Sequence, residues 1–164
     1  LSNVVDNSIE SGGYNDLDLS SLNHPVKSLF FGYSATSIDP TNDRFTFKNA
    51  DIHINGTPLL ENMSPTYFHT CQNYYKSKYG VIDFRVDTED LMYTRYFVYH
   101  FGLNASDYNP SGTCNFSRLD NAKLILRGVE KGNLRGDQKD IYVYATNYNV
   151  LRIKDGLAGI LFGN

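Results

Sequence analysis

Short runs in which every second side chain is large and apolar recur along most of this chain, and this pattern constrains the fold more than any other feature. In 26–33, the alternating apolar positions are Leu29, Phe31 and Tyr33. A period of two places alternate side chains on one face of a β-strand. The run therefore predicts a strand with one buried face.

The same period predicts further strands at 45–48, 50–54, 81–86, 92–101, 122–127, 141–153 and 157–162. Asn55-Gly56 is a turn signal at the end of one of these runs. The 13 Tyr and 10 Phe also suit half-buried pleated surfaces. About eight short strands separated by turn-rich loops predict an all-β antiparallel sandwich or barrel. A parallel α/β fold is excluded because helical segments do not alternate with the strands.

One stretch, 59–75, has a helical period instead, with apolar residues spaced three and four apart. Pro65 lies within it. Ser64-Pro65 therefore predicts an irregular piece followed by a helix, with Ser64 as its cap and Pro65 at its first position. We expect this short helix to be an insertion between early strands.

Residues 1–23 differ from the remainder because they are polar, rich in Ser, Asn and Asp, and show no sustained period. Such a composition is typical of an extended lead-in or linker. The sequence thus predicts a polar lead-in at 1–23, joined to a preceding domain, and a folded domain at 24–164.

The charge balance bears on the class of partner. The 164 residues include 15 basic and 18 acidic side chains, and the net charge is −3. Direct binding of nucleic acid is not expected, because it requires a basic face. No apolar run approaches the roughly 20 residues that cross a bilayer as a helix, so no transmembrane segment is expected. Cys71 and Cys114 are 43 residues apart and are expected to be free, buried thiols in a reducing compartment.

Motifs that carry chemistry are missing from the sequence. There is no nucleophile elbow, P-loop, dinucleotide-binding glycine pattern or His-Glu-Xaa-Xaa-His. Of the four histidines, only His53 and His100 are considered for a site assembled in space, and a hydrogen-bonded or solvated strand histidine is the favoured interpretation. Paired carboxylates such as Glu89/Asp90 are interpreted as solvated turn residues. We expect no catalytic, cofactor-binding or metal-binding residues.

Two long segments resemble signatures of one protein family. They are 110–122 (Pro-Ser-Gly-Thr-Cys-Asn-Phe-Ser-Arg-Leu-Asp-Asn-Ala) and 141–153 (Ile-Tyr-Val-Tyr-Ala-Thr-Asn-Tyr-Asn-Val-Leu-Arg-Ile), the second followed by Asp-Gly-Leu-Ala-Gly at 155–159. Residues 22–27 and 54–56 match the same family in the same order. The chain resembles the major capsid proteins of the nucleocytoplasmic large DNA viruses over about 22–164.

The resemblance implies an eight-stranded antiparallel jelly-roll sandwich with one short helical insertion, the second of two jelly rolls in tandem. It further implies a homotrimer that forms a pseudo-hexameric capsomer of an icosahedral shell. Neighbouring capsomers and minor capsid or penton proteins would be the other partners. The implied location is the virion, after assembly in the host cell cytoplasm, and the implied role is structural, without catalysis.

For such a protein, the functional surfaces are subunit contacts. Loops 34–43, 104–113 and 128–139 are candidates for the outer surface or for neighbouring capsomers. Exposed aromatics suit interfaces, and the candidates are Tyr14, Tyr74, Tyr75, Tyr79, Tyr93 and Tyr108.

Two polar features of the signatures call for specific contacts. The polar triplet 147–149 is expected to anchor a neighbouring loop or mark a bulge. Arg118 is expected to pair with Asp120 or with a carboxylate of a neighbouring subunit.

Two other functions remain open at this stage. A jelly-roll carbohydrate-binding module would use exposed aromatics as sugar platforms, although such modules usually rely on Trp and this chain has none. A cupin-like metalloenzyme is the less favoured alternative, because the sequence lacks two histidines one residue apart on a strand. A jelly roll alone does not decide among these functions.

Overall fold

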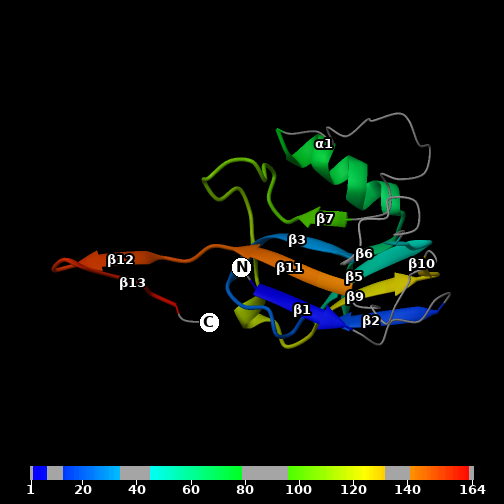
Figure 1. Ribbon diagram of the computed structural model, residues 1–164, viewed down its shortest axis with the longest axis horizontal. Helices are drawn as coiled ribbons and strands as arrows, with labels where there is room; N and C mark the ends of the chain where they lie inside the picture. The colour runs from blue at the N-terminus through cyan, green and yellow to red at the C-terminus, as the bar shows by residue number, and fades with distance from the viewer. Residues whose placement is uncertain (1, 7–12, 34–44, 79–95, 132–140, 163–164) are drawn as a thin grey trace.

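Two antiparallel β-sheets pack face to face in the computed structural model, which describes residues 2–6, 13–33, 45–78, 96–131 and 141–162 (Figure 1). The first sheet has the order β1 (Ser2–Asp6), β11 (Ile141–Asn147), β3 (Pro25–Tyr33) and β7 (Tyr96–His100). The second has the order β2 (Tyr14–Asp18), β9 (Ala122–Arg127), β5 (Asn49–Ile54) and β6 (Thr57–Met63).

The connectivity of these eight strands is that of a jelly roll. Successive strands cross between the sheets, and β5 and β6 form the one hairpin among the eight. The first strand, β1, pairs with the last of the eight, β11. The predicted all-β antiparallel sandwich is confirmed.

The predicted total of eight strands is too low, because five further strands lie outside the two four-stranded paths. Strand β8 (Cys114–Asn115) pairs with β3, while β4 (Phe45–Thr46) pairs with β10 (Glu130–Lys131). The remaining two, β12 (Leu151–Lys154) and β13 (Leu157–Ile160), form a separate hairpin. Figure 1 shows this hairpin projecting from one end of the sandwich.

The core lies between the sheets and follows the alternation that the sequence predicts. Leu29 and Phe31 of β3 are buried, as are the alternate residues of β9 and β11, and all belong to one hydrophobic cluster. Its centre is aromatic: the ring centroids of Phe31 and Phe97 are 5.5 Å apart, and those of Phe47 and Phe97 are 4.7 Å apart. Burial of these rings, together with the aliphatic side chains of the cluster, stabilises the folded chain.

A helical segment runs from Pro65 to Lys76, as the sequence predicts, and covers the edge strand β7 (Figure 1). It comprises a π-helical turn η1 (Tyr67–Cys71) followed by α1 (Gln72–Lys76). Phe68 is fully buried and meets Phe31 edge to face at 5.4 Å. The helix therefore closes the core and protects a sheet edge that would otherwise be free to pair.

The prediction of an extended lead-in at 1–23 is wrong for the residues that the structure describes. β1 and β2 extend the two sheets, and three side chains of this segment, Leu17, Leu19 and Leu22, are fully buried. The burial of β2 does alternate, but the polar Asn15 occupies one of the buried positions and hides the pattern. The boundary between 23 and 24 thus cuts through the sandwich. A preceding domain stays a prediction.

Two other predicted elements differ in the structure. Residues 57–63 form β6 rather than an irregular piece, and their alternation is broken by bulges in the pairing with β5. The run predicted at 141–153 is divided into β11 and β12 by the polar triplet. The predicted strand at 81–86 and the start of 92–101 lie outside the described residues, whereas β7 matches the end of the latter run.

Candidate assembly surfaces

The segments that carry the family resemblance come together in space although they are far apart in sequence. Pro25 and Val26 of β3 pair with Asn115 and Cys114 of β8. The backbone N–H of His24 donates to Oγ of Ser117 at 2.8 Å, and the N–H of Phe116 donates to the carbonyl of His24 at 3.1 Å. The segment 22–27 is thereby joined to 110–122.

The short match at 54–56 is joined to the same place. Asn55 and Gly56 form the turn between β5 and β6, and both have positive φ (50° and 76°), which favours Asn and Gly. The Asn55 side-chain oxygen accepts the backbone N–H groups of Asp120 and Asn121 at 3.1 and 3.2 Å. One asparagine thus shapes a turn and fixes the end of segment 110–122.

The polar triplet 147–149 anchors neighbouring backbone, as predicted, and a bulge lies between Thr146 and Asn147. Nδ2 of Asn147 donates to the carbonyl of Asn23 at 3.1 Å, and the N–H of Tyr148 donates to the carbonyl of Pro25 at 2.9 Å. The side chain of Asn149 bonds the backbone of Val150 and Phe162. We call 22–27, 54–56, 110–122 and 147–149 together the motif cluster.

Loop 104–113 is the one candidate outer loop that the structure describes in full. Ser106 holds it to the end of α1, because its Oγ accepts the N–H of Lys78 at 2.8 Å. Nζ of Lys27 donates to the carbonyl of Asp107 at 2.7 Å. This framework presents Tyr108, which is 98% exposed. Loop 34–43 and most of loop 128–139 lie outside the described residues.

The interface candidates differ in their surroundings. Tyr14, Tyr74, Tyr75 and Tyr108 are exposed. The ring of Tyr14 lies 5.7 Å from the guanidinium carbon of Arg127, so part of its face is already occupied. Tyr79 and Tyr93 lie outside the described residues.

Arg118 is exposed and makes no ion pair with Asp120 in the described part of the chain. Its other predicted partner, a carboxylate of a neighbouring subunit, stays a prediction.

Two buried polar clusters lie on the outer faces of the sheets. The sequence allowed for a hydrogen-bonded His100 but indicated none of the partners in either cluster. His100 of β7 is 4% exposed, and its Nδ1 lies 2.8 Å from Oγ of Ser28 on β3. Gln72 of α1 accepts its backbone N–H, and Lys76 donates to its carbonyl. Burial, reinforced by the charges of Lys76 and Lys27, lowers the pKa of His100 to about 4.

On the other sheet, Asp51 is buried and its carboxylate accepts a short hydrogen bond from Nη2 of Arg127. The backbone N–H of Asn62 also donates to it, at 2.7 Å. The hydrogen bond from Arg127 is the main cause that lowers the pKa of Asp51. This pair joins β5 to β9 and β6, so its role is to hold the sheet.

His53 and His100 are not brought together. They belong to different sheets, and the burial of their neighbours Ile52 and Tyr99 in the core places both histidines on outer faces. Among the described residues there is no cluster of three or more metal-ligating side chains. Cys71 and Cys114 are free, as predicted, but they are half-buried rather than buried. Burial raises the pKa of the Cys114 thiol.

Within the described residues, no helix is long and apolar enough to cross a membrane.

The family model of the large eukaryotic DNA virus major capsid protein matches residues 3–159. The chain belongs to this family of major capsid proteins. The sequence-based resemblance is therefore confirmed, and the match includes the strands β1 and β2 that the predicted domain boundary excluded.

Individual relatives agree with the family. The major capsid protein of Pyramimonas orientalis virus is 32% identical over 155 residues, which cover 87% of this chain and 38% of the relative. That of Paramecium bursaria Chlorella virus 1 is 31% identical over 134 residues, or 71% of this chain and 28% of the relative.

A solved structure supports the fold. The quasi-atomic model of the PBCV-1 virus capsid matches with a TM-score of 0.75 at 22% identity, over 99% of this chain and 50% of that one. The chain therefore spans half or less of the length of the capsid proteins it matches.

Proposed function

We propose that this chain is a shell-forming unit of a viral capsid and acts by binding copies of itself. The observation that carries the proposal is the family match over residues 3–159. The fold agrees with it, because a jelly-roll sandwich with rigid, hydrogen-bonded loops offers fixed surfaces for repeated contacts. The role is structural, without catalysis.

The finer proposal is that the sandwich is the second of two tandem jelly rolls. The chain covers 50% of the matched PBCV-1 capsid chain, which leaves room for a domain of similar size. Three copies of the double protein would form a pseudo-hexameric capsomer. Neighbouring capsomers and minor capsid or penton proteins would complete an icosahedral shell, assembled in the host cell cytoplasm.

The test is the solution mass of the full natural chain, measured by size exclusion with multi-angle light scattering. A mass of three chains at micromolar concentration is expected. A monomer at every concentration would contradict the proposal. Binding on a glycan array would favour the carbohydrate-binding alternative, and a stoichiometric transition metal would favour the metalloenzyme.

A further inference from the structure

The helical segment meets the edge strand β7 through polar side chains, two of which are almost fully buried. His69 is 2% exposed, and its Nδ1 donates to the carbonyl of Tyr96 at 3.1 Å. Gln72 is 3% exposed, and its Oε1 accepts the backbone N–H of His100 at 3.0 Å. Nζ of Lys76 donates to the carbonyl of His100 at 2.8 Å. We call the side chains of His69, Gln72 and Lys76 the edge cover, because all three bond the backbone of β7.

The bonds of the edge cover fall on the side of β7 that faces away from β3. The N–H of Phe101 donates to the carbonyl of Lys27, at the end of the pairing between β7 and β3. Backbone groups alternate in direction along an antiparallel strand, so those of Tyr96, Val98 and His100 point away from β3. Positions spaced three and four apart share one helical face. The edge cover spans about 10 Å of helix and meets about 14 Å of strand, and it takes the place of a neighbouring strand.

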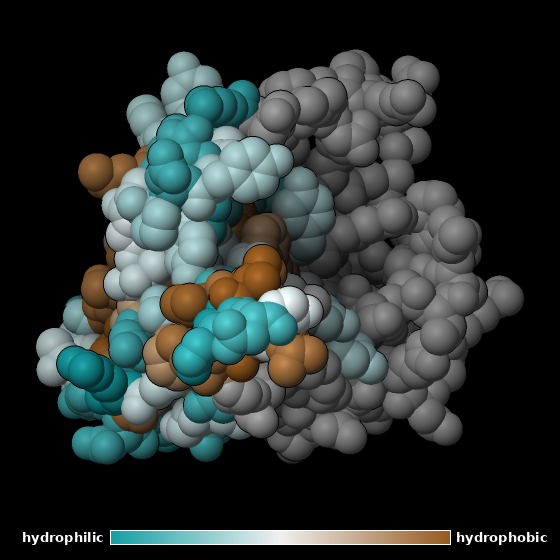
Figure 2. Space-filling model, turned by 90° about the vertical axis from the view of Figure 1, so that its left-hand side faces the viewer, coloured by the Kyte–Doolittle hydropathy of each residue, from teal (hydrophilic) through white to brown (hydrophobic). Residues whose placement is uncertain are grey.

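The outer side of the helical segment is a surface layer. Tyr74 and Tyr75 are 71% and 77% exposed. In Figure 2, the coloured side chains at the top of the molecule, where α1 and loop 104–113 lie in Figure 1, are mainly hydrophilic or intermediate. Helix α1 has five residues, and so short a helix is not stable by itself in water. The helical segment therefore stays on the sandwich through Phe68 in the core and through the edge cover.

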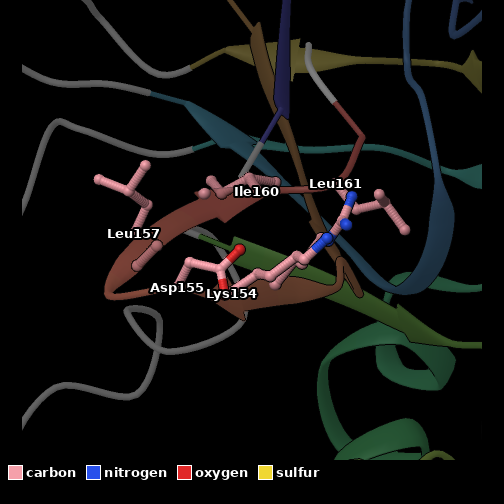
Figure 3. Close-up of a pocket in the computed structure, with 8 residues that line it drawn as sticks. Lys154, Asp155, Leu157, Ile160 and Leu161 are labelled. Atoms are coloured by element: carbon pink, nitrogen blue, oxygen red, sulfur yellow. The ribbon is translucent and has the colours of Figure 1, made fainter.

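The other three edge strands of the two sheets carry features that discourage pairing with another chain. Charged side chains, proline and bulges are the usual ones. Strand β2 has two aspartates, and β1 ends in Asp6. Strand β6 contains Pro58 and is bulged in its pairing with β5. Charges also mark the separate hairpin of β12 and β13, where Figure 3 shows Lys154 and Asp155 beside an open hollow.

Strand β7 itself has none of these features. Its sequence, Tyr-Phe-Val-Tyr-His, contains no acidic residue, Lys, Arg, Pro or Gly, and its pairing with β3 is regular. Uncharged segments of high β-propensity pair readily with copies of themselves when their edge is open. A two-fold axis through Val98 would pair β7 antiparallel with itself. The outward N–H and C=O groups of Tyr96, Val98 and His100 would then all be bonded.

We propose that the edge cover keeps β7 from pairing with β7 of a second copy of this chain. A second copy is the partner that fits, because it presents the same uncharged strand with the same outward backbone groups. Loss of the edge cover leaves buried N–H and C=O groups of β7 without partners, which is unfavourable unless another strand bonds them. This pairing does not depend on the proposed capsid function, since it involves the backbone of a single edge strand.

The experiment compares variants of the full natural chain by sedimentation velocity and hydrogen exchange. His69→Phe/Gln72→Met removes two bonds of the edge cover and keeps side chains of similar size. Relative to the unaltered protein, we expect roughly tenfold or greater increases in self-association and in exchange at the His100 amide. Asn73→Leu is the matched control, because Nδ2 of Asn73 donates to the carbonyl of His69 inside the helical segment. This variant loses an amide bond but keeps the edge cover, and it should associate like the unaltered protein.

A charge on the edge strand should reverse the effect. Tyr96 is 47% exposed, so a lysine at this position keeps its ammonium group in water. Tyr96→Lys, added to the double variant, should return self-association to the level of the unaltered protein, because a lysine on an edge discourages strand pairing. This rescue distinguishes pairing through β7 from association through any other surface.

The proposed role of the edge cover is wrong if the double variant associates no more than the unaltered protein. It is also wrong if Asn73→Leu associates as strongly as the double variant, or if Tyr96→Lys leaves the association unchanged. If circular dichroism shows that the double variant is unfolded, Gln72→Met alone decides: both readouts should rise about threefold or more, and no rise overturns the proposal. The solution mass of the unaltered protein tests the capsid function separately.

Discussion

Mild acid should destabilise this protein through His100, whose ring is buried between β3 and the helical segment. Its pKa is lowered from 6.5 to about 4, so the folded chain keeps the ring neutral in a range where the unfolded chain protonates it. Between these values the unfolded state binds more protons, and the free energy of unfolding therefore falls as the pH falls. The contribution of the neutral His100 ring to the free energy of unfolding is therefore complete above about pH 6.5 and lost by about pH 4.

The magnitude follows from the size of the shift. At about 1.4 kcal/mol for each pKa unit, the loss between pH 6.5 and pH 4 is about 3 kcal/mol. That is a large fraction of the 5–15 kcal/mol that holds a typical domain folded. Protonation is costly here because the ring is buried, the nearby side chains Lys76 and Lys27 are cationic, and Nε2 has no hydrogen-bond partner within the described residues.

Urea denaturation of the full chain at fixed protein concentration, from pH 7 to pH 4.5, measures this slope. His100→Gln removes the titrating ring and should flatten the profile in that window. Lys76→Met removes one of the two cations and should make the slope shallower without abolishing it. The reasoning is refuted if the unaltered protein shows no loss above pH 4.5, or if His100→Gln keeps the full slope.

Four further substitutions test the contacts that hold the fold, each by urea denaturation. Phe31→Ala removes the ring that meets Phe47, Phe68 and Phe97 and should cost about 3–5 kcal/mol; a loss below 1 kcal/mol would mean that the aromatic centre is not tightly packed. Arg127→Met leaves the buried Asp51 carboxylate without its cation and should cost about 2 kcal/mol, because Arg127 itself is partly in water. Lys123→Met, which breaks the exposed pair with Asp16, should cost less, and equal losses would contradict this ranking. Asn55→Gly keeps a residue that tolerates positive φ but removes the acceptor for Asp120 and Asn121; it should cost about 1 kcal/mol and speed hydrogen exchange at those two amides, whereas unchanged exchange would show that the contact is dispensable.

The sequence predicted the parts of the fold that depend on local alternation. Leu29 and Phe31 are buried as expected, because a strand with one buried face repeats every two residues. Prediction failed where a polar residue occupies a buried position, as Asn15 does in β2, and where bulges break the period, as they do in β6. In both cases tertiary contacts override the local pattern.

The contacts at the candidate assembly surfaces were only partly predicted from the sequence. The role of the polar triplet as an anchor was predicted because polar residues in an apolar strand require partners. The partners themselves were not predicted. Asn147, for example, bonds Asn23, and more than a hundred residues separate the two in the sequence. The pairing of His100 with Ser28 has no local signature either, since it depends on the register between β3 and β7.

The pairing of β1 with β11 also determines when, during translation, the first sheet can close. Ser2 lies beside Ala145, so the first strand has no neighbour in its sheet, within the described residues, until the ribosome has made most of the chain. Contacts of such long sequence separation form late. We expect β1 to gain amide protection only after β11 is released, which hydrogen exchange on stalled nascent chains would measure. A copy whose translation stops before β11 would then lack both a closed first sheet and the hairpin that follows it.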